Sequence, residues 1–476
     1  MTSIFTQSED KKINKLYSEL ELEDEFEFMF NNYKDNPLTV SKFLDVLRYL
    51  TIKSKKDNLS LETINSLDII YNYQKKSTSS YRISVNDLSK VNKLMNLVHN
   101  RNNHVIFSIL ISKIYNNSDK SLTLIHKIKN RDDIINIDDF DLRVRKSKET
   151  SVSKKTMDDL MKLSHINRFN INFRYKQRIS LVLVDNNDVR ISIDLTSVKQ
   201  NNNINDLEKT PEIYELEIDL QKKVSTKKNY MDLLNTEILI LKKILQNSDF
   251  IISKQESEKV LLDYKKLVFG KNVNLKKLYS MQPISAEVQH VVDRIPNKYG
   301  ATDKADGEKY CMFISDNKAY LISNNLNIKN TGLKVKNMDG TLIEGEYIYI
   351  ASVKKYLFLS YDILMFKGND IRNEQNLKKR LQILDQAMKE MFSYSFDFKD
   401  FSGKFSVDNM SDFYRKEVKS YFDNMDNLLN TDSNDAIFLR KFFVFPSGGT
   451  SSEIFAYSAL MWELYTETES VKCPYV

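Results

Sequence analysis

The chain has 476 residues, enough for two or three domains that each bury a core of their own. Its 71 basic and 65 acidic residues leave a net charge of +6, which excludes the large basic excess of a nucleic-acid coat, so a polyanion would bind to local clusters of cations. Two widely separated cysteines exclude a disulfide framework, and neither a signal-like start nor a membrane-length apolar run is found, so we expect a cytoplasmic protein that is not secreted.

The first predicted strand spans residues 22–30 (LEDEFEFMF), in which acidic and apolar residues alternate. This alternation places Glu23, Glu25 and Glu27 on one face of the strand. An acidic row on a strand repels itself unless water or a cation neutralises it. Residues 38–50 follow with apolar residues at helical spacing, which predicts a helix that packs against a core.

Further strands with the same alternation carry basic residues. Their cations are, in chain order, Arg82 in YRISVND, Arg143 and Arg145 in FDLRVRKSKE, and Arg174, Lys176 and Arg178 in NINFRYKQRISLVLV. The segment 188–199 (DVRISIDLTSVK) continues the pattern through Asp194 and ends at Lys199. We therefore expect basic rows to face acidic rows.

A second acidic strand spans residues 214–220 (YELEIDL), where Glu215, Glu217 and Asp219 share one face. A single E-x-E strand is most simply an edge exposed to solvent. Two such strands that converge would supply the all-oxygen ligand set that a divalent cation prefers.

Two arrangements explain charged rows that lie opposite apolar rows. In an ordinary β-sandwich the charged face is the solvent face. In a closed barrel the apolar face points outward beneath helices, and the charged face lines a lumen. Glutamates on one wall and cations on another would then suit a metal-bound triphosphate. The sequence leaves both arrangements open.

Two helices are predicted between the halves of the chain, at residues 227–246 and 253–268, from apolar positions at i, i+3 and i+4. We expect them to join or brace two domains. The alternative, a coiled coil that binds a partner, is disfavoured because the pattern does not continue for enough heptads.

The segment Lys304-Ala-Asp306-Gly307 places an amine, a carboxylate and a backbone without a side chain within four residues. A deprotonated lysine amine is a nucleophile toward phosphorus. Asp306 would orient a sugar hydroxyl or the amine, and Gly307 would let the backbone approach a nucleotide closely. The alternative is a surface turn, since D-G is a common turn dipeptide.

Two more segments of the second half carry acids on predicted strands. One is Glu344-Gly345-Glu346, and the other is the apolar run 355–366 (KYLFLSYDILMF), which contains the single acid Asp362. An acid at a strand end can bind a ribose or a metal ion. The alternative is a buried strand whose acid is held by a structural partner.

The two E-x-E strands, the R-Y-K-Q-R strand and I-D-L-T-x-V-K resemble the triphosphate-tunnel RNA triphosphatases of large DNA viruses and fungi. The resemblance implies an antiparallel β-barrel tunnel with flanking helices, in which the catalytic metal ligands are Glu25, Glu27, Glu215 and Glu217. It implies triphosphate contacts at Arg82, Arg143, Arg145, Arg174, Lys176, Arg178 and Lys199, with assistance from Glu23, Asp194 and Asp219.

In their order, K-A-D-G, E-G-E and Y-D resemble motifs I, III and IIIa of the covalent nucleotidyltransferase superfamily, which includes mRNA guanylyltransferases and nucleic-acid ligases. Residues 281–310 resemble the lead-in of viral mRNA capping enzymes of the poxvirus and mimivirus kind. The resemblance implies that Lys304 is the catalytic nucleophile. It implies GTP contacts at Lys304, Asp306, Gly307, Lys309, Glu346 and Asp362.

Two departures from the superfamily pattern affect this second activity. Lys309 stands where many members have arginine, and a lysine cannot form the same planar fork to a phosphate. Neither the D-G strand of motif IV nor the K-x-K strand of motif V follows. We therefore expect a fragment that ends before motif IV, with weak or absent formation of lysyl-GMP.

We accordingly expect an α+β protein with an RNA triphosphatase tunnel domain at 1–224, a helical linker at 225–280, and an incomplete guanylyltransferase domain of antiparallel sheets and helices at 281–476. The expected function is mRNA 5′ capping, in which Mg²⁺ or Mn²⁺ promotes removal of the γ-phosphate and GMP is then transferred from GTP. Expected partners are the RNA 5′ end and GTP, with a methyltransferase or an RNA polymerase as further candidates and no membrane, in a viral factory or virion. A nucleic-acid ligase and a non-catalytic RNA-binding subunit remain alternatives.

Overall fold

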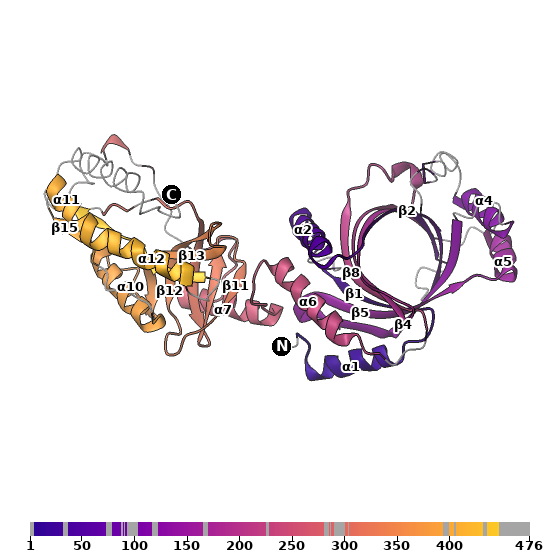
Figure 1. The fold of residues 1–476 in the computed structure, drawn as a ribbon, viewed down its shortest axis with the longest axis horizontal. Coiled ribbons are helices and arrows are strands. Elements are labelled where there is room, and N and C mark those ends of the chain that lie inside the picture. The colour runs from indigo at the N-terminus through magenta and orange to yellow at the C-terminus, as the bar shows by residue number, and fades with distance from the viewer. Residues whose placement is uncertain are drawn as a thin grey trace. The chain divides into compact units, whose positions relative to one another are not determined.

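The computed structural model describes most of the chain in two compact units, Met1–Asn247 and Ser248–Val476 (Figure 1). The described residues are 4–31, 37–72, 79–86, 89, 91–92, 103–116, 122–164, 170–224, 228–279, 285, 287–289, 300–302, 304–393, 399–403, 406–431 and 436–446. None of the helices within these ranges combines the length and the hydrophobicity needed to cross a lipid bilayer.

The first unit is a closed barrel of eight antiparallel strands. Its strands are β1 (Asp24–Phe30), β2 (Leu61–Asn72), β3 (Ser79–Val85), β4 (Leu122–Ile137), β5 (Leu142–Ser151), β6 (Asn170–Asp185), β7 (Val189–Asn201) and β8 (Ile213–Lys222). Around the barrel they follow the order β1-β5-β4-β3-β2-β6-β7-β8. The barrel closes because β1 pairs with β5 along one edge and with β8 along the other.

Helices pack against the outside of this barrel (Figure 1). They are α1 (Gln7–Ser18), α2 (Val40–Asp57), α4 (Asn103–Tyr115), α5 (Lys154–Ser164) and α6 (Met231–Gln246), with short 3₁₀ turns at Asp138–Phe140 and Ile204–Asp206. The largest core joins the outward rows of the strands to α1, α2 and α6, through contacts that include Phe28, Val46 and Leu234. A second core lies beneath α4 and α5 and includes Phe173 and Leu110.

In the barrel, the apolar face of each strand points outward and is buried beneath the helices. On β1, Phe26 and Phe28 are fully buried in the core beneath the helices, so Glu25 and Glu27 point the other way, into the lumen. The closed barrel, which the alternation left open and the resemblance implied, is therefore confirmed, and the sandwich is excluded. Glu23 does not belong to the acidic row, because it lies before β1 with a positive φ of 66° and is exposed.

The second unit is built on a seven-stranded sheet. Its strands are β9 (Glu308–Ser315), β10 (Lys318–Ser323), β11 (Ile328–Lys334), β12 (Leu342–Ile350), β13 (Lys355–Phe366), β14 (Asn369–Asp370) and β16 (Ala436–Arg440). The order is β11-β10-β9-β12-β13-β14, and β16 pairs in parallel with β13 whereas the other pairs are antiparallel.

Helices cover both faces of this sheet. They are α7 (Lys254–Phe269), α10 (Leu377–Met391), α11 (Val407–Phe413) and α12 (Lys419–Thr431), with a π-helical segment at Tyr414–Val418 between the last two. The core of α10 includes Met312, and the core of α7 includes Cys311, its neighbour on β9. A small parallel sheet of β15 (Phe401–Gly403) and β17 (Val444–Pro446) completes the unit.

The structure corrects the expected helical linker at 225–280. Ile238 of α6 is buried in the barrel core, whereas Tyr264 of α7 is buried against the sheet of the second unit. The two helices therefore belong to different units, and the boundary lies between residues 247 and 248. Both predicted helices are confirmed, but apolar positions at helical spacing do not show which core receives each apolar face.

We predict that Ile238→Ala destabilises the barrel unit by about 2–5 kcal/mol, because a fully buried aliphatic side chain leaves a cavity when it is truncated. Chemical denaturation followed by circular dichroism measures this change. Ile52→Ala is the matched control, since Ile52 of α2 is 59% exposed. Equal effects of both substitutions would contradict the assignment of α6 to the barrel core.

Candidate functional site

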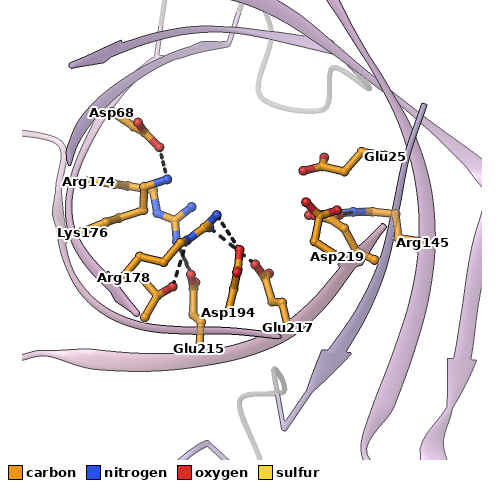
Figure 2. A network of polar contacts seen from close by, with 12 residues as sticks. Glu25, Asp68, Arg145, Arg174, Lys176, Arg178, Asp194, Glu215, Glu217 and Asp219 are labelled. Atoms are coloured by element: carbon orange, nitrogen blue, oxygen red, sulfur yellow. Dashed lines mark hydrogen bonds and ion pairs between the residues drawn. The ribbon is translucent and has the colours of Figure 1, made fainter. Parts of the chain in front are cut away.

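The lumen of the barrel holds acidic and basic side chains from all eight strands, which we call the lumen cluster. Its members are Glu25 and Glu27 (β1), Asp68 (β2), Arg82 (β3), Lys127 and Lys129 (β4), Arg145 and Glu149 (β5), Arg174, Lys176 and Arg178 (β6), Asp194 (β7), and Glu215, Glu217 and Asp219 (β8). Figure 2 shows Glu25, Arg145 and Asp219 on one wall and Asp68, Lys176 and Arg178 on another.

The acids of β1 are held by cations of β4 and β5. Glu25 accepts a hydrogen bond from Lys127 and another, at 3.1 Å, from the hydroxyl of Ser147. Glu27 accepts from Nε of Arg145 at 2.6 Å and lies 3.7 Å from Nζ of Lys127. The lysine therefore bridges both acids of the first E-x-E strand.

The acids of β7 and β8 are held by cations of β6. Arg174 donates to both carboxylate oxygens of Glu215, at 2.7 and 2.8 Å. Arg178 forms an ion pair with Asp194 at 2.8 Å and lies 3.8 Å from Glu217. The basic row of β6 thus faces the acidic row of β8 across β7, as the sequence predicted.

Burial and mutual repulsion shift the pKa values of the lumen acids in opposite directions. Burial, followed by the charges of Glu27 and Glu215, raises the pKa of Glu217 to about 7. Burial and the charges of Glu25 and Glu27 raise the pKa of Asp219 well above its usual range. Burial opposes ionisation of Glu25 too, but Lys127 overcomes it and lowers the pKa of that acid to about 2.

The four glutamates predicted as metal ligands share one lumen, but cations keep them apart. Among the residues that the structure describes, no three His, Cys, Asp or Glu side chains are arranged to hold one ion. The chemistry of the donors nevertheless fits a hard divalent cation, because the acids of the cluster are all carboxylates, and burial together with their mutual repulsion raises the pKa values of Glu217 and Asp219. One oxygen each of Asp194 and Asp219 is also buried without a hydrogen-bond partner.

The remaining predicted triphosphate contacts differ in their placement. Arg82 donates to Glu149 at 3.0 Å, and Lys176 forms an ion pair with Asp68, so both side chains lie in the lumen. Arg143 shares the face of Arg145 on β5 and donates to the side chain of Asn136 at 2.9 Å.

Lys199 does not join the lumen cluster, which corrects its prediction as a phosphate contact. In the register of β6 and β7 it lies opposite Tyr175, on the outward row that also contains the buried Leu195. Its ammonium donates to the backbone carbonyl of Glu208 at 3.1 Å. Even-numbered residues of β7, such as Asp194 and Thr196, face inward, and Lys199 is odd-numbered and faces outward.

Sequence reasoning missed Lys127, Lys129, Asp68 and Glu149. The two lysines lie in the segment LTLIHKIKN of β4, where basic and apolar residues alternate as they do in the recognised basic strands. That alternation was the available signal for the lysines. Asp68 is a single acid in the apolar end of β2, and no pattern distinguishes it.

In the second unit the segment containing Lys304 leads into β9 and is exposed at Lys304, Asp306 and Gly307. A Cβ atom added at Gly307 would lie 2.5 Å from Cγ1 of Ile348 on β12, so glycine is needed there for a close approach of the backbone. The backbone at Gly307 therefore passes close to β12, beside Glu346, whose Cβ would lie 3.2 Å from the added atom.

Two ion pairs lie on one face of the sheet next to this segment. Lys309 lies 3.2 Å from Glu344, and Glu346 lies 3.6 Å from Lys441. Both lysines also face the ring of Tyr361, each 5.9 Å from its centroid. The structure therefore brings Lys309 and Glu346 together, as predicted, and adds Glu344, Lys441 and Tyr361, which sequence reasoning did not assign.

Asp362 has a structural partner, which favours the alternative stated for it. Its carboxylate accepts two hydrogen bonds from Arg380 of α10, at 2.9 and 3.0 Å, and is buried. The ion pair attaches α10 to β13. The structure thus does not present this acid to a nucleotide.

We predict that Glu217→Gln makes the chain more stable above pH 7 in EDTA. A folded-state pKa raised from 4.5 to about 7 favours folding below pH 4.5, and this contribution is lost as the pH rises through 7. Thermal unfolding of both chains should diverge by on the order of 1–3 kcal/mol above that pH. The exposed Glu208→Gln is the control, and parallel profiles for Glu217→Gln and the unchanged chain would contradict the prediction.

Comparisons with known proteins agree with the resemblances. Residues 215–421 match the family model of the mRNA capping enzyme, catalytic domain. The chain is 30% identical over 478 residues to a probable mRNA-capping enzyme of Acanthamoeba polyphaga mimivirus. The alignment covers 98% of this chain and 38% of that protein. The chain thus spans well under half the length of this curated relative.

Solved structures of the mimivirus capping enzyme also match. Its RNA triphosphatase domain, described in a study of a trifunctional mimivirus mRNA capping enzyme, is 22% identical, covers 52% of this chain and 99% of its own, and superposes with a TM-score of 0.39. A triclinic form of the mimivirus capping enzyme triphosphatase is 21% identical, covers 51% and 100%, and gives a TM-score of 0.38. The comparisons show that this chain is similar to a viral mRNA capping enzyme over nearly its whole length, and that residues 215–421 resemble the catalytic domain of that family.

Proposed function

We propose that this chain acts in mRNA 5′ capping, with the barrel removing the γ-phosphate of the RNA 5′ end and the second unit transferring GMP. The observation that carries the first activity is that acidic rows from β1 and β8 and basic rows from β5 and β6 meet inside one lumen. A triphosphate needs both a metal and cations, and the lumen offers donors for each.

Glu25, Glu27, Glu215 and Glu217 would hold Mg²⁺ or Mn²⁺, since the lumen offers oxygen donors only. The bound ion would polarise the γ-phosphate toward attack by water. Arg145, Arg174 and Arg178, now paired with the glutamates and Asp194, would turn to the phosphate oxygens and neutralise the charge that develops. Their guanidinium forks suit two phosphate oxygens at once.

The second activity rests on Lys304 and its surroundings. The Nζ atom of Lys304 would attack the α-phosphorus of GTP, forming an N–P bond, breaking the P–O bond to pyrophosphate and losing a proton. The RNA diphosphate end would then take the GMP and restore the free lysine. Lys309 and Lys441, on the sheet face beside this segment, are the nearby cations available to the nucleotide phosphates.

We predict that Glu25→Ala and Glu217→Ala each reduce release of phosphate from triphosphate-ended RNA by about 10²-fold or more, because each removes a metal ligand from the lumen. A phosphate-release assay with Mg²⁺ and with Mn²⁺ measures the effect. Glu21→Ala serves as control, since this side chain lies outside the lumen and is 75% exposed. Activity that survives both lumen substitutions would remove the metal-site argument, and a chain that is inactive with either metal would favour the non-catalytic alternative.

We also predict that radiolabelled GTP labels Lys304 weakly or not at all, because no K-x-K strand of motif V follows the Y-D strand in this sequence, and that ATP labels it no better. A robust label with GTP would contradict this prediction. Lys304→Ala should lose any label because no other amine stands at that position, whereas the exposed Lys336→Ala should keep it. Gel analysis after denaturation detects the phosphoramidate. Labelling by ATP in preference to GTP would support the ligase alternative instead.

A further inference from the structure

Lys129 differs from the other cations of the lumen cluster. Six of them lie beside a carboxylate, and they are Arg82, Lys127, Arg145, Arg174, Lys176 and Arg178. Within the described part of the chain, Lys129 has neither an ion pair nor a side-chain hydrogen bond nor a ring contact. It is therefore a cation of the lumen whose charge no carboxylate of the described residues neutralises directly.

The register of the strands places Lys129 close to the acids of β1. Lys129 lies opposite Ser147 on β5, and Ser147 lies opposite Glu25 on β1. Two interstrand spacings, about 10 Å, therefore separate the backbones of Lys129 and Glu25 along one inward row. Directly after Lys129 the pairing of β4 with β5 is interrupted, and it resumes at Ile134. Lys129 is therefore the last residue of β4 before the irregularity that pairs with β5 in the first register, and its side chain faces the lumen.

The electrostatic surroundings of Lys129 are mostly positive. Burial, followed by the charges of Arg145 and Lys127, lowers the pKa of Lys129 to about 8, whereas the charge of Glu27 acts in the opposite direction. Arg174 contributes to the same effect although β3 and β2 separate its strand from β4, so the two charges interact across the lumen. A place where several cations surround an unpaired ammonium attracts an anion.

We propose that Lys129 is the residue of the lumen that binds an anionic oxygen of the substrate's phosphate chain first, before the paired cations exchange their carboxylates for phosphate. The inference rests on the proposed triphosphatase function of the barrel and assigns a residue that the sequence did not suggest. The paired cations must each leave a carboxylate to take up phosphate, which costs part of the energy gained. Among the residues that the structure describes, Lys129 has no such partner to leave.

The same geometry separates a substrate-binding role from a structural one. Removing a cation among cations relieves repulsion, so Lys129→Met should leave thermal stability unchanged or raise it slightly. Lys127→Met should behave differently, because it leaves Glu25, Glu27 and Glu149 without their shared cation. A purely structural lysine at position 129 would instead destabilise the chain when it is removed.

The test uses the full chain and inorganic tripolyphosphate. We expect Lys129→Met to raise KM about 10- to 100-fold with little change in kcat, because the variant loses one charge-assisted hydrogen bond to bound substrate. Calorimetric titration in EDTA should show weaker binding in the same proportion. Lys129→Arg should restore most of the affinity, and Lys148→Met, which removes a lysine from the outward row of β5, should change neither value.

The outcomes distinguish this inference from the function on which it rests. Failure of the unchanged chain to bind or cleave tripolyphosphate would refute the proposed function. Binding by the unchanged chain with unaltered KM and affinity in Lys129→Met would refute the inference alone. Loss of affinity accompanied by a lower thermal midpoint, without rescue by Lys129→Arg, would also overturn it, because position 129 would then act through the fold.

Discussion

The pairing of β1 with both β5 and β8 is the interaction on which the first unit depends. It joins Glu27 to Arg145 through one ladder and to Asp219 through the other, so one strand brings cation and carboxylate rows to the same place. The closed ring leaves no unpaired strand edge, and it excludes the alternative in which charged rows face solvent. Without this closure the two E-x-E strands, nearly 200 positions apart in the sequence, would have no shared space.

A lumen filled with charges is costly, which suggests that it is retained for chemistry rather than for stability. Taking ion pairs out of water costs desolvation energy that their attraction barely repays. Here burial, followed by the charges of Glu27 and Glu215, raises the pKa of Glu217 in spite of Arg178 and Arg145. In the proposed function, phosphate oxygens would replace carboxylates at the arginines while a metal ion takes the carboxylates, and each such exchange costs the energy of an ion pair.

The alternation of side chains predicted the acidic and basic strands because a strand has only two faces and the apolar face must be covered. It did not predict Asp68, whose inward position depends on the pairing of β2 with β3 and β6. The prediction of Lys199 as a phosphate contact is wrong because this residue, at the end of the strand, lies one position out of phase with the inward row of β7. Phase, rather than charge, decides which side chains reach the lumen.

In the second unit a register irregularity also decides which way a side chain points. Between β12 and β13 the pairing shifts near Gly345, so that Tyr361 is left over between the partners Ser360 and Asp362. Such a bulge re-aims the side chains that follow it. Tyr361 accordingly faces Lys309 and Lys441, whereas Asp362 meets Arg380 of α10. The two residues of the Y-D pair therefore point in different directions. The ring of Tyr361 faces the proposed nucleotide site, and the carboxylate of Asp362 faces the core.

The two units place their unpaired lysines by a common arrangement. In the described ranges neither Lys129 nor Lys304 has a carboxylate beside its ammonium, while Lys127, Lys309 and Lys441 each have one. A paired lysine holds local structure and keeps its charge occupied. Within the lumen cluster this difference separates Lys129, which has no carboxylate beside it among the described residues, from Lys127, which bridges Glu25 and Glu27.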